Sequence, residues 1–275
     1  MPRSEVTKLG ILAGSGNLPK HVIEACKEKG IKYCVIGFED ETDAGILSED
    51  ANTYKFKVYA VSKIINKFKE EGVTHVTMAG RVKRADLARL LLDIKGAKLL
   101  ALILKSGLAD NSVLMTVLNF IEREGFEIIP PESIASDVVM HKGCITKTKP
   151  NESAEKDISQ GLKILKGIAN FDVGQALVIQ GGLTLGVEAA EGTDELIRRC
   201  GEVRQTGDEA PILIKISKPN QDRRVDLPCI GPLTIENAFK YGFRGIAVEA
   251  GSTLILDQEE TVSLANKYKI FIIGV

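Results

Sequence analysis

The feature that most constrains this chain is the alternation of short apolar runs with amphipathic segments in its first third. An apolar run at residues 9–13 leads into an amphipathic stretch at 19–29 and then a second apolar run at 33–36. Alternation of this kind predicts βαβ units and a parallel sheet. The rhythm continues in four further segments, which we predict as helices at 61–71, 85–95 and 111–124 and a buried strand at 75–79.

A polar stretch at residues 143–155 interrupts this pattern and offers little apolar surface to bury, as is typical of a linker or surface loop. Beyond it we predict helices at 156–168, 234–241 and 259–267 and strands at 176–180, 183–188, 212–216, 245–249 and 270–273. The chain has 275 residues, which is enough for two cores. We therefore predict an α/β protein of two domains: an N-terminal parallel-sheet, Rossmann-like domain at 1–135, a linker at 136–157, and a C-terminal mixed α/β domain at 158–275.

Composition excludes several classes of protein. The net charge of −1 gives no general electrostatic reason to expect a nucleic-acid partner. Five widely spaced cysteines without a CxxC pair argue against a disulfide framework and against structural zinc. The N-terminus lacks the uninterrupted apolar region of a secretory signal, and the apolar run at 99–104 is far too short to span a bilayer. We expect a soluble, cytoplasmic protein that could touch a membrane surface.

A glycine-rich loop, GILAGSGNLP at residues 10–19, follows the first predicted strand and opens the first predicted helix. Glycines let a phosphate approach the backbone, and a helix N-terminus offers unpaired N–H groups. The loop lacks the third glycine of the dinucleotide fingerprint and the lysine of a P-loop. A ligand loop and a simple tight turn both stay open. The candidate ligand-binding residues here are Gly14, Ser15, Gly16 and Asn17.

A cationic cluster follows the predicted strand at 75–79 and should lie at the same edge of the sheet. Arg81 is its leading candidate, because a planar guanidinium suits bidentate recognition of phosphate. The alternative is a solvated group of charges at a helix start. Lys83 and Arg84 complete the cluster.

An acid-rich segment, VEAAEGTD at residues 187–194, follows a predicted strand and opens a helix. Such a density of carboxylates can hold a hard divalent cation. Alternatively Thr193 or Asp194 caps the helix. The candidate residues are Glu188, Glu191, Gly192, Thr193 and Asp194.

A second charged segment runs from Lys215, at the end of an apolar run, through RRVDLP at residues 223–228. If Asp226 lies in a cleft beside Arg223 or Arg224, its ionised form is favoured, which suits metal binding or the orientation of water better than proton donation. Without other information, a surface turn with salt bridges explains this segment as well.

Together these segments resemble the LpxI family, the UDP-2,3-diacylglucosamine pyrophosphatases of lipid A biosynthesis. The resemblance extends along essentially the whole chain. It rests on five blocks in consistent order: LAGSGNLP at 12–19, GRV at 80–82, DVGQA at 172–176, VEAAEGTD at 187–194 and DLPCIGP at 226–232. The segment GIAVEAG at 245–251 gives further support.

The resemblance implies a two-domain enzyme that uses Mg²⁺ or a similar ion to hydrolyse the pyrophosphate of UDP-2,3-diacylglucosamine, giving 2,3-diacylglucosamine 1-phosphate and UMP. It implies that Asp226 is the catalytic aspartate of the C-terminal domain. We infer Glu188 and Asp194 as further metal ligands. We also infer that Glu191, Gly192, Thr193, Lys215 and Arg224 bind substrate with Gly14, Ser15, Gly16, Asn17 and Arg81. The resemblance is also compatible with peripheral contact with the inner membrane and with a homodimer.

Two other interpretations and one sub-hypothesis accompany this resemblance. The βαβ rhythm and glycine loop also fit a nucleotide-cofactor oxidoreductase, with Glu39 or Asp40 contacting a ribose, although Pro19 replaces the third glycine. A non-catalytic lipid or nucleotide binder leaves the charges around Asp226 unexplained. Acyl chains of the substrate need apolar walls, which the run at 99–104 or the helix face with Val113 and Val117 could provide, with core packing as the alternative.

Overall fold

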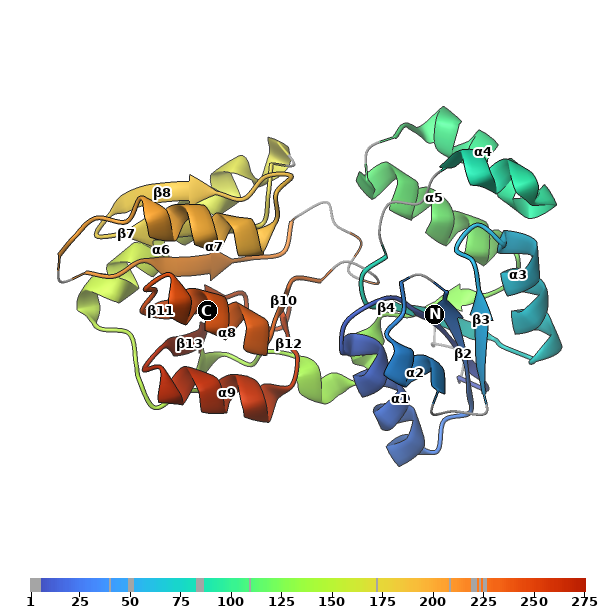
Figure 1. The fold of residues 1–275 in the computed structure, drawn as a ribbon, viewed down its shortest axis with the longest axis horizontal. Coiled ribbons are helices and arrows are strands. Elements are labelled where there is room, and N and C mark those ends of the chain that lie inside the picture. Colours follow the sequence, from blue (N-terminus) through green and yellow to red (C-terminus); the bar gives the residue numbers. More distant parts are fainter. Residues whose placement is uncertain are drawn as a thin grey trace. The chain divides into compact units, whose positions relative to one another are not determined.

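The chain forms two compact units, shown by a computed structural model that describes residues 6–39, 41–48, 52–82, 87–108, 110–171, 173–207, 209–218, 222, 224 and 227–275. The first unit comprises Met1–Ser136 and Asp222–Val225, and the second comprises Asp137–Gln221 and Asp226–Val275. Figure 1 shows the first unit in blue to green and the second mainly in yellow to red.

The first unit is built on a parallel sheet, as the sequence predicts. Its strand order is β3-β2-β1-β4-β5 and all four pairings are parallel. The strands are β1 (Leu9–Ala13), β2 (Tyr33–Phe38), β3 (Thr53–Phe56), β4 (His75–Ala79) and β5 (Glu127–Ile128). The helices are α1 (Leu18–Lys29), α2 (Ala44–Ser48), α3 (Val61–Glu70), α4 (Ile94–Ser106) and α5 (Asp110–Arg123). Right-handed crossovers place α1 and α2 on one face and α3, α4 and α5 on the other (Figure 1).

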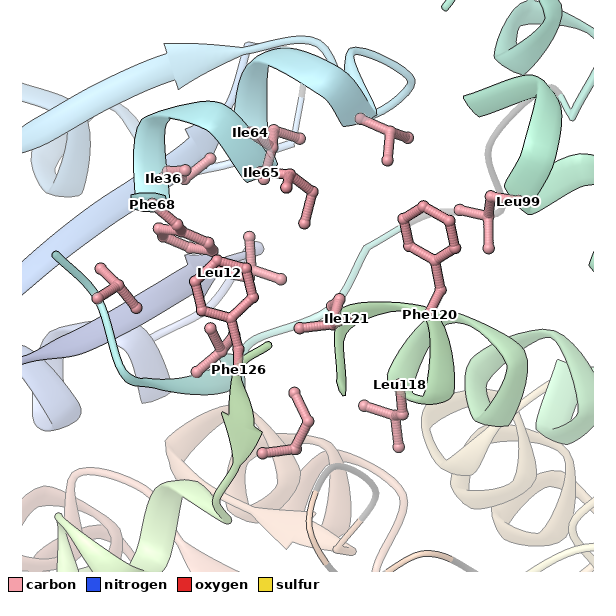
Figure 2. Close-up of a cluster of buried hydrophobic side chains, with 14 of the residues drawn as sticks. Leu12, Ile36, Ile64, Ile65, Phe68, Leu99, Leu118, Phe120, Ile121 and Phe126 are labelled. Atoms are coloured by element: carbon pink, nitrogen blue, oxygen red, sulfur yellow. The ribbon is translucent and has the colours of Figure 1, made fainter. Parts of the chain in front are cut away.

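The core of the first unit lies between the sheet and α3, α4 and α5. Figure 2 shows side chains from the strands, such as Leu12 and Ile36, facing those of the helices. Phe68 of α3 and Phe126, just before β5, meet edge to face with ring centroids 5.8 Å apart, the arrangement that aromatic pairs prefer. The apolar face of α3 repeats at the helical period, so burying it against the sheet fixes the orientation of this helix.

One predicted helix differs from the structure. Residues 85–95 were expected to form a helix, whereas Leu87–Leu92 form the 3-10 turn η1 and α4 begins at Ile94. The Asp93 carboxylate accepts from the N–H of Gly96 at 2.7 Å and so caps a new helix. The apolar run at 99–104 lies in α4. This helix has a weak contrast between its apolar and polar faces, so its periodicity did not predict it. No helix within the described ranges is long and apolar enough to cross a membrane.

The second unit has the mixed sheet that the sequence predicts, in the order β6-β13-β11-β9-β7-β8. Its strands are β6 (Gly143–Cys144), β7 (Ala176–Gln180), β8 (Leu183–Val187), β9 (Ile212–Lys215), β11 (Gly245–Val248) and β13 (Phe271–Gly274). Strands β9, β11 and β13 are parallel, while β7 runs antiparallel to β9 and to β8. A small second sheet pairs β10 (Cys229–Ile230) with β12 (Leu254–Ile255).

Helices cover the larger sheet of the second unit. They are α6 (Glu152–Ile168), α7 (Thr193–Glu202), α8 (Pro232–Lys240) and α9 (Gln258–Lys267). Ile158 and Leu165 of α6 belong to one buried cluster, and Leu196, Ile235 and Ala265 of the other three helices belong to a second. The sheet is therefore packed on both faces, as parallel strands require.

Residues 136–157, expected to form a linker, belong almost entirely to the second unit. They contain β6, which pairs antiparallel with β13, and the first turns of α6. Their polar side chains satisfy backbone groups: Thr146 accepts from the N–H of Ile272 at 3.0 Å, and Asn151 caps α6 by accepting from the N–H of Ala154 at 2.8 Å. Polar composition here reflects an edge strand and a helix cap.

Candidate active site

Charged side chains gather at one edge of the sheet of the second unit. Lys215 is the last residue of β9, and Glu249 directly follows the parallel strand β11. Glu188 follows β8, and its N–H donates to the carbonyl of Ala176, the residue that pairs with Lys215. The carboxyl edge of parallel strands is where α/β proteins bind ligands. We name Glu188, Thr193, Lys215, Ser217 and Glu249 the second-unit edge.

Glu188, Thr193 and Lys215 form a connected chain of hydrogen bonds. The Thr193 hydroxyl donates to Glu188 Oε1 at 2.6 Å and accepts from Lys215 Nζ at 3.1 Å. Lys215 also donates to the carbonyl of Cys229 at 3.1 Å. Glu188 is only 6% exposed and Lys215 only 4%. Charges buried to this extent are unfavourable unless they are paired and hydrogen-bonded, so the fold stabilises a positive charge at the sheet edge.

Gly174 explains how Glu188 is held. A Cβ at Gly174 would lie 2.0 Å from the carbonyl oxygen of Glu188, so no other residue fits without displacing the backbone. This close approach lets the next N–H, that of Gln175, donate to Glu188 Oε2 at 3.0 Å. The DVGQA block therefore has a structural reason for its glycine.

The acids at 187–194 do not converge on one point. Glu191 pairs with Arg199, whose Nη2 lies 2.8 Å from Glu191 Oε1. Hydrogen bonding, first to its own backbone N–H and then to Arg199, lowers the pKa of Glu191. Asp194 accepts from the amide of Asn237 in α8 at 3.1 Å. Gly192, at φ +81°, precedes α7, and neither Thr193 nor Asp194 caps that helix: Gly192 stands at the cap position.

The predicted metal ligands therefore have other partners where they are described. Among the described residues, no group of three or more His, Cys, Asp or Glu side chains is close enough to hold a metal ion. Glu188 accepts from Gln175 and Thr193, and Asp194 accepts from Asn237. Asp226 lies outside the described residues. Mg²⁺ is commonly held by one or two carboxylates together with the phosphates of the substrate, a mode that needs no preformed protein cage.

Sequence reasoning missed Ser217 and Glu249. Glu249 accepts from both the backbone N–H of Ser217, at 3.0 Å, and its hydroxyl. These bonds fix the chain directly after β9, ahead of the segment that contains Asp226. The available signal was positional: Glu249 is the last residue of the strand predicted at 245–249, within the GIAVEAG block.

Arg224, predicted to bind substrate, groups with the first unit together with Asp222. Its guanidinium donates to Asp222 at 2.7 to 3.1 Å and to Glu122 of α5 at 2.6 Å. Hydrogen bonding to Asp222 raises the pKa of Arg224, and the same contact lowers the pKa of Asp222. Arg224 is thus a paired cation here. Arg223 lies outside the described residues.

The glycine loop of the first unit is tied to the loop after β4. The N–H of Ser15 donates to the carbonyl of Arg81 at 2.8 Å, and the N–H of Arg81 donates back to Ser15 at 2.9 Å. A Cβ at Gly14 would lie 2.3 Å from the carbonyl oxygen of Arg81. The structure thus brings together the two segments that the sequence placed at one edge. Lys83 and Arg84 lie outside the described residues.

The loop N–H groups proposed for phosphate are engaged within the protein. Gly14 donates to the carbonyl of Ala79 at 2.8 Å, and Gly16, at φ +88°, donates to Asp43 Oδ2 at 2.8 Å. Thr42 links the same region by donating to the carbonyl of Ala13 at 2.5 Å. Sequence reasoning missed Thr42 and Asp43, because it looked for acids at 39 and 40, nearer the end of β2. We name Gly14, Ser15, Gly16, Asp43 and Arg81 the first-unit edge.

The segments considered as acyl walls lie largely in the core. Leu99, Leu100 and Ile103 are buried in the cluster between sheet and helices, and Val113 and Val117 pack against it. Leu104 is exposed and points out of this cluster.

The sequence and structure were compared with known proteins. The family models described as LpxI N-terminal domain and LpxI C-terminal domain match residues 8–138 and 141–273. A curated protein of Caulobacter vibrioides, named UDP-2,3-diacylglucosamine pyrophosphatase LpxI, is 34% identical over 281 residues, which cover 98% of this chain and 97% of the relative.

Solved structures resemble the chain only weakly. The Bordetella bronchiseptica enzyme WbmG, in complex with NAD and UDP, matches at a TM-score of 0.30 and 18% identity over 46% of this chain and 37% of its own. The biotin carboxylase domain of the Hydrogenobacter thermophilus 2-oxoglutarate carboxylase matches at a TM-score of 0.29 and 16% identity over 72% of this chain and 41% of its own. Neither carries an argument about function. The two domain matches and the full-length relative do, and the chain belongs to the LpxI family.

Proposed function

We propose that this chain hydrolyses the pyrophosphate of UDP-2,3-diacylglucosamine to 2,3-diacylglucosamine 1-phosphate and UMP, in lipid A biosynthesis. Support comes from its full-length relative, which is named as a UDP-2,3-diacylglucosamine pyrophosphatase, and from the two matched domains. The single structural observation that carries the proposal is the buried Lys215, held at the carboxyl edge of the sheet by Thr193 and Cys229. A fixed cation there suits a ligand with a pyrophosphate.

The reaction sets the requirements of the site. The oxygen of a water molecule bonds to one phosphorus, the bond from that phosphorus to the bridging oxygen breaks, and the bridging oxygen leaves on the other phosphate. Attack at either phosphorus gives the same two products. Negative charge grows on the leaving phosphate, and a preorganised cation lowers the free energy of that transition state. Lys215 supplies this charge in our proposal, with Glu188 holding Thr193 and thus the ammonium in place.

Asp226 orients the attacking water and accepts its proton in our proposal. The assignment rests on the DLPCIGP block and on the position of the segment between β9 and β10. An ionised carboxylate is required for this role, and the resemblance to the LpxI family is what distinguishes Asp226 from Asp222, the other acid of this segment.

We propose that the reaction requires Mg²⁺ or another divalent cation, which would polarise the phosphoryl oxygens when bound. Asp226 together with the pyrophosphate oxygens would hold it, because Glu188 and Asp194, the other two predicted ligands, have protein partners. Removal of divalent ions with a chelator should abolish UMP release, and added Mg²⁺ should restore it. Full turnover in the chelator would contradict the metal requirement, but it would not contradict the proposed hydrolysis.

The deciding experiment compares Asp226→Ala with Asp222→Ala in an assay of UMP release. We expect Asp226→Ala to stay folded and to lose about a hundredfold to ten-thousandfold in turnover, the range for a group that moves the proton. The matched control removes an acid four residues away that pairs with Arg224, and it should keep most of the activity. Near-full turnover of Asp226→Ala would show that the catalytic assignment is wrong.

We also propose a cytoplasmic location, where the cysteines would stay reduced.

Substrate binding by the first-unit edge is a further part of the proposal. Arg81 is the proposed phosphate contact, since its side chain is exposed while its backbone is fixed.

A saturable titration with nicotinamide cofactors tests the oxidoreductase alternative directly. Tight binding would favour that alternative over hydrolysis.

A further inference from the structure

The turn η1 and helix α4 expose large apolar side chains to solvent. Ile94 is 80% exposed, Leu92 77% and Leu104 63%, with Leu91 and Leu108 also exposed. A patch of this kind on one element marks an interaction surface more often than scattered single residues do. The substrate chemistry proposed above does not use it.

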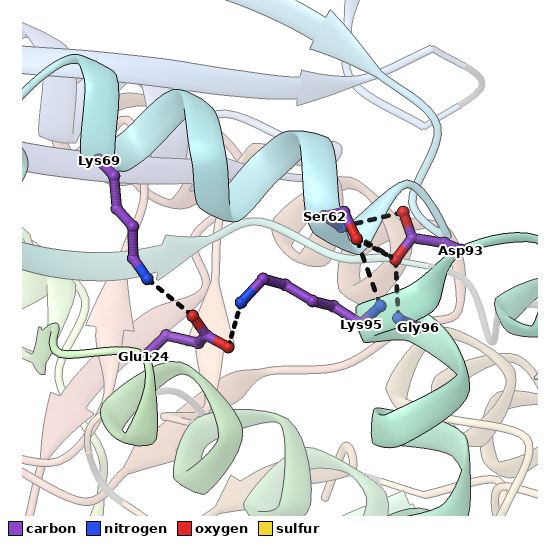
Figure 3. A network of polar contacts seen from close by, with 6 residues as sticks. All are labelled: Ser62, Lys69, Asp93, Lys95, Gly96 and Glu124. Carbon is purple, nitrogen blue, oxygen red and sulfur yellow. Dashed lines mark hydrogen bonds and ion pairs between the residues drawn. The ribbon is translucent and has the colours of Figure 1, made fainter.

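The inner side of α4 is fixed, so its outer side is presented in one orientation. Leu99, Leu100 and Ile103 are buried in the core of the first unit. Asp93 caps the helix and accepts from both the N–H and the hydroxyl of Ser62 in α3 (Figure 3). Glu124 binds Lys95 of α4 and Lys69 of α3 through separate oxygens. The helix cannot roll to bury its exposed residues without breaking these contacts.

The exposed side of α4 combines apolar and positively charged residues. Positions spaced by three, four and seven residues share one side of a helix, and the exposed set here is Ile94, Lys98, Ala101, Leu104 and Lys105, which we name the α4 face. Helix α4 contains three lysines and no acid. Lys95 pairs with Glu124, and no carboxylate of the described residues pairs with Lys98 or Lys105. The face is therefore both apolar and cationic.

We propose that the α4 face docks on the surface of a bilayer containing anionic phospholipid. Lysines flanking leucine and isoleucine are typical of helices that lie in the membrane interface, where the stems of the lysines pack on apolar surface and the ammonium groups reach the phosphates. A second copy of this chain fits less well, because a twofold contact would bring the same lysines together. With 13 residues, α4 is too short to span a bilayer and lies along it.

The docking goes beyond the hydrolysis proposed above, and it is measurable without substrate. Sedimentation with vesicles of phosphatidylethanolamine and phosphatidylglycerol should retain the protein at low salt, and retention should fall as salt screens the charges. Vesicles of phosphatidylcholine alone should retain it more weakly. No binding to the anionic vesicles, or equal binding to both kinds, would overturn the proposal.

Two double variants of the α4 face, each with a control double variant in the second unit, locate the surface. Ile94→Gln with Leu104→Gln should weaken vesicle partitioning by about tenfold or more. The matched control, Phe171→Gln with Leu233→Gln, alters side chains that are 77% and 60% exposed in the second unit and should leave partitioning unchanged. Lys98→Gln with Lys105→Gln should weaken it about fivefold for each lysine. Its control is Lys163→Gln with Lys166→Gln, on the exposed side of α6.

The variants also separate docking from catalysis. All four pairs should keep the thermal stability of the parent, because the residues are exposed, and should hydrolyse substrate dispersed in detergent at the parent rate. Unchanged partitioning of both α4 pairs would place the membrane contact elsewhere and overturn the proposal. Loss of turnover in detergent would assign α4 to substrate binding and overturn docking as its role. Inactivity of the parent protein in detergent would count against the proposed hydrolysis alone.

Discussion

The two sheet edges use the same topology in different ways. The first-unit edge is made mainly from backbone: N–H groups of Gly14, Ser15 and Gly16 donate to Ala79, Arg81 and Asp43. The second-unit edge is made from side chains, with Glu188 and Lys215 buried and joined through Thr193. A backbone-built edge gives shape to a surface. A buried, charged edge keeps an electrostatic field fixed at one point, which is what catalysis of phosphoryl transfer requires.

The largest effect is expected when the positive charge of Lys215 is removed from the second-unit edge. Lys215→Met keeps most of the side-chain volume and removes the charge, and we expect kcat to fall about a hundredfold to a thousandfold, as for loss of one preorganised donor. Pre-steady-state measurement of UMP release checks this. Lys267→Met, in the last turn of α9, is the control. A rate within a few-fold of the parent would mean that Lys215 only holds Thr193 and the carbonyl of Cys229 in place.

The next largest effects are expected when a close-packed glycine of either edge is replaced by alanine. A Cβ at Gly174 or at Gly14 would lie 2.0 or 2.3 Å from a backbone oxygen, so each alanine variant should lose about 1–3 kcal/mol of stability. Only Gly174→Ala should also lower kcat strongly, because it displaces Glu188. Urea unfolding followed in parallel with turnover measures both effects.

Two outcomes would contradict this difference between the edges. If Gly14→Ala lowers kcat as much as Gly174→Ala, the first-unit edge takes part in the chemical step. If neither variant is destabilised, the close contacts relax easily. Gly167→Ala is the control, because a Cβ there meets nothing within 4 Å.

The sequence predicted the elements far better than it predicted the partners of the charges. Strands at 9–13, 75–79 and 176–180 have the bounds expected, because apolar runs between turn residues are local signals. The partner of a charge is set by tertiary packing, as when Arg224 meets Glu122 more than a hundred residues away. A local pattern also cannot show that Gly16 donates to Asp43. The acids at 187–194 are clustered in sequence, yet Glu188 accepts from Thr193, Glu191 from Arg199 and Asp194 from Asn237.

A smaller effect is expected at the exposed cation of the first-unit edge. Arg81→Ala should raise KM about tenfold and leave kcat nearly unchanged, because a charge-assisted contact to phosphate is lost. Arg81→Lys should recover part of the affinity. Steady-state kinetics with purified substrate provides the measurement. An unchanged KM would make Arg81 a surface charge, and the first-unit edge would then be structural throughout.

The smallest effect is expected at Glu191, which was a candidate for substrate binding but faces Arg199. Glu191→Gln should change kcat and KM by no more than about twofold, since exposed pairs of this kind contribute little. Glu191 also has a pH signature. Hydrogen bonds from its own backbone N–H and from Arg199 lower its pKa in the folded state, so its stabilising contribution is present above the ordinary glutamate value and is lost as pH falls through the lower, folded value. Thermal melting between pH 3 and 6 should thus show a slightly smaller acid destabilisation in Glu191→Gln than in the parent. A large loss of activity with unchanged melting would instead place Glu191 against the substrate, and the second-unit edge would then also include Glu191.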